Sequence, residues 1–307
     1  MRHFLWPTII YLLIWGGALA YAVGVAEMDP RGPLLALGIF GIGLPLVVHV
    51  LMIGTTPFPT TEEVSWLEPI ALALLVLFAA VFFVIGSELP RTLAEAVAPG
   101  SESARLVFAA LVNIVFYVVL PFVFMSLLIR HPISSFGWQS PFWRMFNPRH
   151  IVVLLVLGGG MAAVQFSGTP IGMNLRVGNY SQEQLLVALP LVYVWLVLAG
   201  GLAHAFFFRG VLQERIAMLT GNAWAGMFLA AAVGALIQVP AQIIHQSGGA
   251  LTPGHIIATA ILTGSVTGIT FGYVWMRTRN LLLLMLLYGA VSLIASFEGV
   301  AGAFGLI

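Results

Sequence analysis

The most informative stretch of the chain is His204-Ala-Phe-Phe-Phe-Arg-Gly-Val-Leu-Gln-Glu-Arg215. It continues an apolar run that begins at Leu185 and holds no charged residue before Arg209. A run of this length is sufficient to cross a bilayer as a helix. Ionisable side chains among membrane helices are expensive and usually functional. The stretch therefore predicts a membrane helix with a polar, potentially functional end, where Glu214 and Arg215 form a solvated pair.

The composition excludes a soluble domain. Of the 307 residues, 60% are hydrophobic and 7% are charged, whereas a soluble domain carries about 25% charged residues. The chain has no cysteine, which excludes disulfides, thiolate metal sites and cysteine nucleophiles. Its net charge of +1 indicates no nucleic-acid partner. The composition therefore predicts a helical membrane protein, with membrane lipids among its partners.

Apolar stretches of roughly 20 residues recur along the chain, and the charges cluster between them. We therefore predict an all-α fold, a polytopic transmembrane helical bundle with about nine spans. The first stretch lacks the cleavage pattern of a signal peptide and is expected to remain as a helix. The fifth is short and glycine-rich, so we expect it to be tilted, broken or re-entrant. The predicted spans are 4–25, 33–54, 67–87, 105–129, 150–166, 184–208, 223–244, 255–276 and 280–297.

The distribution of arginines predicts the orientation. With nine spans, eight arginines fall on one side of the membrane and four on the other. Cytoplasmic loops carry the excess of basic residues. We therefore expect a protein of the plasma (inner) membrane with its N-terminus in the cytoplasm and its C-terminus outside. The arginines on the predicted cytoplasmic side are Arg2, Arg130, Arg144, Arg149, Arg209, Arg215, Arg277 and Arg279.

Two further stretches accompany the first one in the C-terminal part. The second is Gly234-Ala-Leu-Ile-Gln238-Val-Pro240. The third runs from Gly272-Tyr-Val-Trp-Met-Arg-Thr-Arg-Asn280-Leu to Leu287-Tyr-Gly-Ala-Val-Ser-Leu293. Together the three resemble the motifs of the CPBP family, glutamic-type intramembrane proteases that include the CAAX proteases and bacteriocin-processing enzymes. The resemblance is strongest over 185–294. It implies a CPBP-like core at 151–307, preceded at 1–150 by transmembrane helices without an identifiable motif.

The resemblance also implies which positions carry the chemistry. In the family, a glutamate helped by a histidine activates water, and a second histidine with an asparagine stabilises the oxyanion, as a general base and oriented donors must. The first motif reads Glu-Glu-x-x-x-Arg, and this chain keeps the arginine. The family-equivalent positions are His204, Ala205, Arg209, Gln238, Tyr288 and Ser292. Because neutral groups stand where the carboxylates and histidines belong, we predict a pseudoenzyme.

Three functions follow as hypotheses. The first is a catalytically inactive scaffold or assembly factor with a peptide or membrane-protein partner, since function resides in the site and not in the fold. The second is a divergent intramembrane endopeptidase that uses His204 with Gln238, Tyr288 or Ser292. The third is a subunit of a larger membrane complex, or a transport or cofactor protein. The alternative roles of Gln238, Tyr288 and Ser292 are hydrogen bonds between neighbouring helices.

Metal and cofactor sites are not predicted. His245 and His255 bracket a glycine-containing loop and are weak metal candidates, because their spacing matches no metal signature and a third ligand is missing. A bis-histidine haem would require two intramembrane histidines, and His49 and His204 are the one possible pair in the sequence. Gly264, Gly268 and Gly272 recur every four residues, a spacing that lets membrane helices approach closely.

Overall fold

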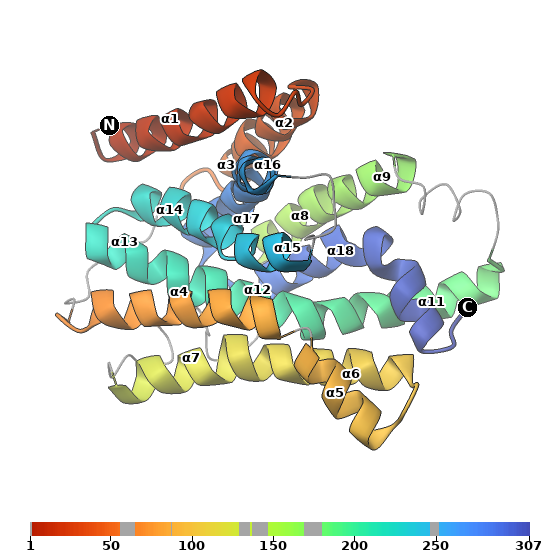
Figure 1. The fold of residues 1–307 in the computed structure, drawn as a ribbon. Coiled ribbons are helices and arrows are strands. Elements are labelled where there is room, and N and C mark those ends of the chain that lie inside the picture. Colours follow the sequence, from red (N-terminus) through yellow and green to blue (C-terminus); the bar gives the residue numbers. More distant parts are fainter. Residues whose placement is uncertain are drawn as a thin grey trace. The chain divides into compact units, whose positions relative to one another are not determined.

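The computed structural model describes residues 2–55, 65–86, 88–128, 136, 147–168, 180–245 and 252–307. Within these ranges the regular structure is helical, with no strand (Figure 1). The predicted all-α fold is therefore confirmed. The chain divides into two compact units, which are described separately. The first comprises Met1–Ile85, Pro121–Gly137 and Phe207–Arg279, and the second comprises Gly86–Leu120, Trp138–Phe206 and Asn280–Ile307. Both units combine segments from before and after residue 150. The predicted division of the chain at residue 150 therefore rests on the sequence motifs alone.

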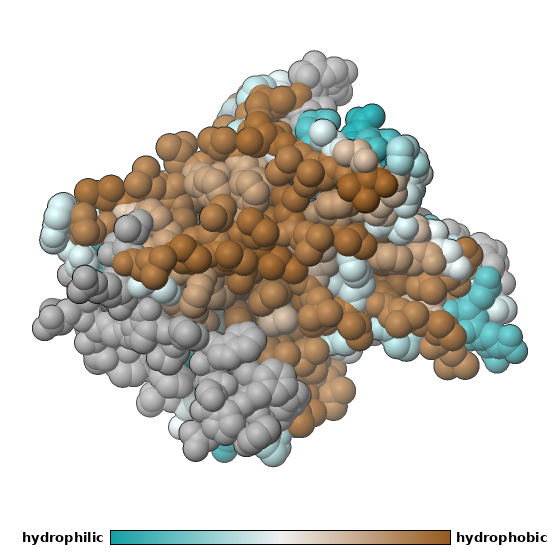
Figure 2. All heavy atoms as spheres, turned by 90° about the horizontal axis from the view of Figure 1, so that it is seen from below, coloured by the Kyte–Doolittle hydropathy of each residue, from teal (hydrophilic) through white to brown (hydrophobic). Residues whose placement is uncertain are grey.

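Eight of the described helices are long and apolar enough to cross a membrane. They are Leu5–Gly24, Arg31–Leu51, Glu68–Ile85, Glu102–Leu127, Gln182–Thr220, Ala223–Ile244, Pro253–Thr278 and Leu281–Ala303. The expected fifth span is the shorter apolar helix Pro148–Ala163. The helix that contains the predicted span 184–208 runs from Gln182 to Thr220. On the face shown in Figure 2, hydrophobic residues cover most of the described surface, as lipid-facing helices require.

The first unit is built around the close pair α14 and α17. Its segments, with η marking π-helical turns, are α1 (Arg2–Gly24), α2 (Arg31–Ala36), η1 (Leu37–Gly43), α3 (Leu44–Leu51), α4 (Glu68–Ile85), η3 (Phe124–Leu128), α13 (Glu214–Thr220), α14 (Ala223–Leu236), α15 (Val239–His245), α16 (Pro253–Thr259), η9 (Ala260–Gly264) and α17 (Ser265–Thr278). A Cβ added to Gly268 would lie 3.0 Å from the Ala231 Cβ, and one added to Gly264 would lie 3.4 Å from the Ala235 Cβ. Gly264, Gly268 and Gly272, which we call the glycine stripe, therefore pack within the protein, against α14.

Hydrogen bonds attach the N-terminal helices of this unit to α17 and the segment before it. The Tyr11 and Ser265 hydroxyls lie 2.7 Å apart, and the Trp15 indole donates to the Leu262 carbonyl at 3.2 Å. At the end of α3, His49 Nδ1 lies 2.8 Å from the Tyr273 hydroxyl. Buried polar groups of membrane helices need such partners because lipid offers none.

The second unit is built around α18 (Leu281–Ala303). Its other segments are α5 (Glu88–Val97), α6 (Glu102–Ile114), η2 (Val115–Val119), α8 (Pro148–Val153), η6 (Leu154–Gly158), α9 (Gly159–Gly168), α11 (Gln182–Leu196), η7 (Val197–Gly201) and α12 (Leu202–His204). Two segments, α7 (Leu120–Val123) and η8 (Ala205–Gln213), cross the boundary between the units. The buried core of this unit joins α11 to α18 through Ala188, Val192, Leu196, Ile294, Phe297, Val300 and Ala301.

The segment from α8 to α9 runs beside α18. At one end, the Asn280 amide lies 2.9 Å from His150 Nδ1. Farther along, a Cβ on Gly158 would lie 3.1 Å from the Ala290 Cβ, and the Gln165 amide donates to the Val291 carbonyl. The Tyr180 hydroxyl, which precedes α11, donates to Glu298 near the other end of α18 at 2.9 Å. The short helix Pro148–Ala163 therefore runs along α18, as expected if it is the predicted fifth span.

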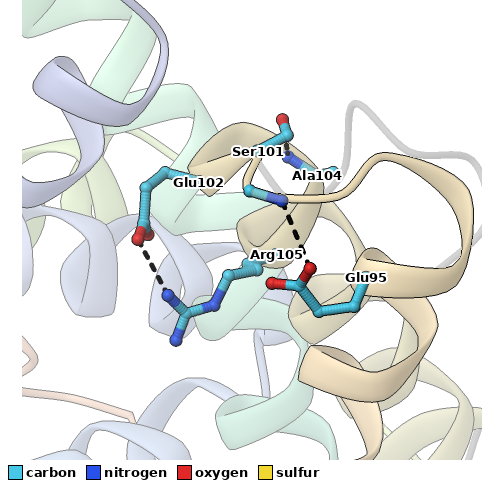
Figure 3. Close-up of polar contacts among 6 residues, drawn as sticks. Glu95, Ser101, Glu102, Ala104 and Arg105 are labelled. Atoms are coloured by element: carbon cyan, nitrogen blue, oxygen red, sulfur yellow. Dashed lines mark hydrogen bonds and ion pairs between the residues drawn. The ribbon is translucent and has the colours of Figure 1, made fainter.

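A polar turn joins α5 to α6 in the second unit (Figure 3). The Ser101 hydroxyl caps α6 by accepting from the Ala104 amide at 3.2 Å, and Glu95 accepts from the Gly100 amide at 3.3 Å. Arg105 and Glu102 form an exposed ion pair at 2.8 Å. Such exposed pairs contribute less than about 1 kcal/mol to stability. The ion pair therefore marks a polar end of α6 and adds little to the stability of the fold.

Candidate active site

The first motif lies on one helix that runs from Gln182 to Thr220. A capping box starts the helix, because Ser181 and Gln184 satisfy each other's backbone amides. Two π-helical segments interrupt it, η7 before His204 and η8 after it. Such π-helical turns occur frequently at functional sites. The helix ends at Gly221, which adopts a left-handed conformation with φ +61°.

His204 and Tyr288 form the centre of a cluster in the second unit. Their rings stack with centroids 4.6 Å apart and an interplanar angle of 22°. Ser292, one turn beyond Tyr288 on α18, hydrogen-bonds to the Tyr288 side chain. A Cβ on Gly200 would lie 2.8 Å from Tyr288 Cε1, so this glycine makes room for the ring. We call His204, Tyr288, Ser292 and Gly200 the His204 cluster.

Ala205 follows His204 and is buried. Its methyl group contributes neither a proton acceptor nor a charge, although the resemblance places the second carboxylate of the motif here. The structure thus brings together three of the predicted site residues: His204, Tyr288 and Ser292. Arg209 and Gln238 belong to the other unit, which is described separately.

Arg209 and Gln213 form a buried polar network in the first unit. Arg209 Nη1 donates to Gln213 Oε1 at 3.1 Å, and Gln213 Nε2 donates to the Gly272 carbonyl on α17 at 2.9 Å. Arg209 is 7% exposed and Gln213 2%. Within the described part of the chain, Arg209 pairs with no carboxylate, and a neutral amide oxygen accepts from the cation. We call Arg209, Gln213 and Gly272 the Arg209 network.

The glycine stripe provides the space for this network. A Cβ on Gly272 would lie 2.8 Å from Met227 Cγ, 2.9 Å from Gln213 Oε1 and 3.2 Å from Arg209 Nη1. One on Gly268 would lie 3.4 Å from Arg209 Nη2. The missing side chains of α17 therefore admit the guanidinium between packed helices, where a larger residue would displace it.

Glu214 and Arg215 are buried, which corrects the expectation that they form a solvated pair. Glu214 forms an ion pair with Arg279 and accepts from the Trp275 indole at 3.4 Å. Arg215 is fully buried, with its guanidinium carbon 5.7 Å from the centre of the Phe136 ring. Hydropathy misses this arrangement because these partners lie far away in sequence. A cation over an aromatic face gains most when water is excluded.

Gln238 lies at the turn that joins α14 to α15, within the candidate span Ala223–Ile244. Its side chain is half-buried, and its carbonyl accepts from the Gln242 amide at 3.2 Å. None of the described residues hydrogen-bonds to the Gln238 side chain, so the expected link to a neighbouring helix is not among the contacts of the structure. Gly234, one turn earlier, packs on Phe208, whose Cδ1 would lie 3.1 Å from an added Cβ.

The histidine candidates for metal or haem lie in separate settings. Residues 246–251 and the side chain of His245 fall outside the described part of the chain, and His255 lies in the first turn of α16. His49 bonds to Tyr273 through Nδ1, whereas His204 stacks on Tyr288. Among the described residues, no group of three His, Asp or Glu side chains is placed to hold a metal ion.

Sequence reasoning missed Gly200, Tyr273 and Phe136. Gly200 precedes His204 by one helical turn, and this small-residue spacing is a signal that could have identified it. Tyr273 belongs to the third motif, but its partner His49 comes from a distant helix. Phe136 carries no local signal for its contact with Arg215.

Comparison with known proteins gives one match, over part of the chain. Residues 186–294 match the family model described as "Rce1-like: Type II CAAX prenyl endopeptidase Rce1-like". The match confirms the resemblance predicted for 185–294. No curated protein and no solved structure matches the chain. With its membrane-spanning helices, the protein is an integral membrane protein with a CAAX-protease-like region.

Proposed function

We propose that this CAAX-protease-like membrane protein is catalytically inactive and acts as a scaffold or assembly factor for a peptide or membrane-protein partner. The observation that carries the proposal is the stack of His204 on Tyr288, at 4.6 Å and 22°. By resemblance, the first of these positions would hold the general base, and the second would hold a histidine that stabilises the oxyanion. In this chain the two side chains bind each other.

The chemistry of the His204 cluster supports this proposal. A general base must reach the proton of the attacking water, and oxyanion donors must point to where negative charge develops. The Tyr288 ring covers one face of the imidazole, and Ser292 hydrogen-bonds to Tyr288. Ala205 adds no carboxylate. The cluster thus lacks the carboxylates with which the first motif of the family, by resemblance, activates water.

The Arg209 network supports a structural role for the arginine of the motif. Its guanidinium is buried against Gln213 and the glycines of α17. These contacts hold η8 to α17, and they do not depend on which residue occupies the position of the general base. A protein can therefore keep this arginine and the glycines around it for folding alone.

A cleavage assay tests the proposed inactivity. Purified protein in phospholipid vesicles is incubated with a library of membrane-anchored peptides, and products are detected by mass spectrometry. We expect no product from the wild type or from His204→Ala. Leu198→Ala, at a lipid-facing position on the same helix, serves as the matched control. Turnover by the wild type and by Leu198→Ala that His204→Ala abolishes would overturn the proposal.

Isolation of the intact protein in mild detergent tests the proposed scaffold role. We expect one membrane protein or peptide to co-purify at a fixed stoichiometry, and peptide mapping to show it uncut. Chemical crosslinking in the membrane before solubilisation should yield the same partner. Recovery of the chain with detergent and lipid alone, with and without crosslinking, would argue against a scaffold.

A divergent endopeptidase is the second candidate. It is favoured by the convergence of His204, Tyr288 and Ser292 in one unit. A neutral imidazole is a general base at neutral pH. This candidate predicts turnover that falls when acid protonates the imidazole and that Ser292→Ala reduces. The cleavage assay, repeated over pH, separates the two proposals.

We also propose that the N-terminus lies in the cytoplasm of a cell whose inner membrane holds the protein, with the C-terminus outside. Because the chain has no cysteine, a single introduced cysteine reports its own location. We expect a membrane-impermeant maleimide to label Met28→Cys and Ile307→Cys in intact cells. Arg149→Cys should be labelled only after the membrane is opened. The reverse pattern would invert the orientation, and labelling of all three in intact cells would refute it.

A further inference from the structure

A groove of about 500 Å³ lies in the first unit between α1 and α14, away from the residues discussed so far. On α1 it is lined by Trp6, Ile10 and Ile14, and on α14 by Ala225, Leu229 and Ala232. Successive lining residues are three or four positions apart, so each set occupies one face of its helix. The eight steps from Trp6 to Ile14 correspond to about 12 Å along the axis.

The base of the groove is fixed by a stack of two aromatic rings. Tyr11 and Phe228 have centroids 5.1 Å apart at 28°, and both are buried. The Tyr11 hydroxyl is bonded to Ser265 on α17 at 2.7 Å, which prevents the ring from turning into the groove. Ala225 and Ala232 leave the space above the stack open. The groove is therefore formed by packing before anything binds in it.

The open side of the groove faces the membrane. Trp6 is 69% exposed, and Ile10 and Ile14 are also exposed. These residues lie in the candidate span Leu5–Gly24, and Ala225 and Ala232 lie in the span Ala223–Ile244. Acyl chains surround such helices in a bilayer. One end of the groove reaches Thr220 and Asn222, at the turn between α13 and α14, where the two spans end.

The lining of the groove fits a hydrocarbon chain better than a peptide. An extended peptide would bury backbone amides and carbonyls against a lining that is almost wholly hydrophobic, and each unsatisfied group costs several kcal/mol in lipid. None of the described charged residues lines the groove. A single hydrocarbon chain needs neither hydrogen-bond partners nor a counter-charge.

We propose that this groove holds one acyl chain of a membrane phospholipid, as a bound lipid distinct from the freely exchanging lipid around the protein. The chain lies along α1 and α14 on the Tyr11–Phe228 stack. The headgroup lies at the Thr220–Asn222 turn, level with Trp6, because indoles prefer the membrane–water boundary. Headgroup charge is not recognised, since the groove presents no charged side chain.

Photo-crosslinking of the full chain tests the proposal. The probe is phosphatidylcholine with a diazirine on one acyl chain, in phosphatidylcholine vesicles that contain the purified protein. We expect adducts on peptides that cover residues 6–14 and 222–232, and one retained phospholipid per chain in native mass spectrometry. Ala232→Trp fills the groove and should abolish both signals. Leu12→Trp, on the opposite face of α1 and 47% exposed, is the matched control and should change neither.

Each other outcome overturns the proposal. Retention of lipid and adducts by Ala232→Trp would show that labelling comes from the surrounding bilayer. Absence of retained lipid together with a dimer that Ala232→Trp dissociates would assign the groove to a second copy of the chain. If Ala232→Trp fails to fold, Ile10→Trp replaces it, because it enlarges the other wall of the groove.

Discussion

The Arg209 network and the His204 cluster draw on the same long helix, at Arg209 and at His204 five residues earlier, and they differ in how they are built. In the network, an arginine, a glutamine and a backbone carbonyl are joined by two hydrogen bonds, in space that two glycines leave open. In the cluster, an aromatic ring occupies space left by one glycine and stacks on a histidine. We expect the first arrangement to depend on each residue and the second to tolerate exchange of its side chains. Such a difference would explain how a protease-like helix keeps its arginine while the positions of the proposed chemistry hold other residues.

The strongest test of the comparison enlarges a glycine of the Arg209 network. Gly272→Leu would force its side chain against Met227, Gln213 and the guanidinium of Arg209. Overpacking of a buried site costs about 1–3 kcal/mol, and displacement of a buried cation adds to it. We expect a loss of at least about 3 kcal/mol, measured as reversible unfolding in detergent with increasing denaturant.

A second glycine provides the control for this substitution. Gly160 on α9 has no atom within 4 Å of an added Cβ, so Gly160→Leu should leave stability unchanged or raise it slightly through helix propensity. Equal losses in the two variants would mean that membrane helices here reject any larger residue. In that case the network would not be the reason why Gly272 is needed.

A double-mutant cycle measures the network directly. Gln213→Leu removes the acceptor of Arg209, and an unsatisfied buried group costs about 1–3 kcal/mol. Arg209→Met removes the cation and leaves the amide oxygen without its donor. We expect the double variant to lose less than the sum of the two single losses, because neither partner then remains unpaired. Additive losses, measured by the same unfolding experiment, would show that the two side chains act independently.

The sequence predicts the fold well and the site in part, for reasons that these residues make clear. Apolar run length is a local property, so eight membrane helices and the short fifth one follow from it. The end of the helix at Thr220 does not follow, because Glu214 and Arg215 resemble solvated residues until Arg279 and Phe136 approach them. Hydropathy cannot register partners that are supplied by other helices.

The same limit applies to the candidate site. Motif spacing identified His204, Arg209 and Tyr288, since each occupies a fixed position in a local pattern. The stack between His204 and Tyr288 depends on how α12 packs against α18, and on the space left by Gly200. Neither sequence segment alone specifies that contact.

A substitution of Gly200 tests whether the His204 cluster is the more tolerant of the two. Gly200→Ala places a Cβ 2.8 Å from the edge of the Tyr288 ring, which belongs to a side chain that can shift. We expect a loss of about 1 kcal/mol, at the low end of overpacking, in the same unfolding measurement. Combining it with Tyr288→Leu should add no further loss, because the clash is then absent. A loss as large as that of Gly272→Leu would remove the distinction between the two regions.

The smallest expected effect separates the two roles of Tyr288. Tyr288→Phe keeps the ring that stacks on His204 and removes the hydroxyl that bonds to Ser292. A typical hydrogen bond contributes about 1 kcal/mol net. In the Tyr288→Phe variant, the Ser292 hydroxyl loses this partner and bonds instead to a carbonyl of its own helix, as helix serines do. We therefore expect a change of at most about 1 kcal/mol in unfolding free energy, with Ser292→Ala giving the same value. Tyr288→Leu, which removes the stack as well, should cost about 0.5–1.5 kcal/mol more than Tyr288→Phe. If Tyr288→Phe instead proves the most damaging of the three, the hydroxyl and not the ring holds the cluster together. The polar groups around His204 would then form a specified network like that of Arg209, and the case for a divergent hydrolase would gain accordingly.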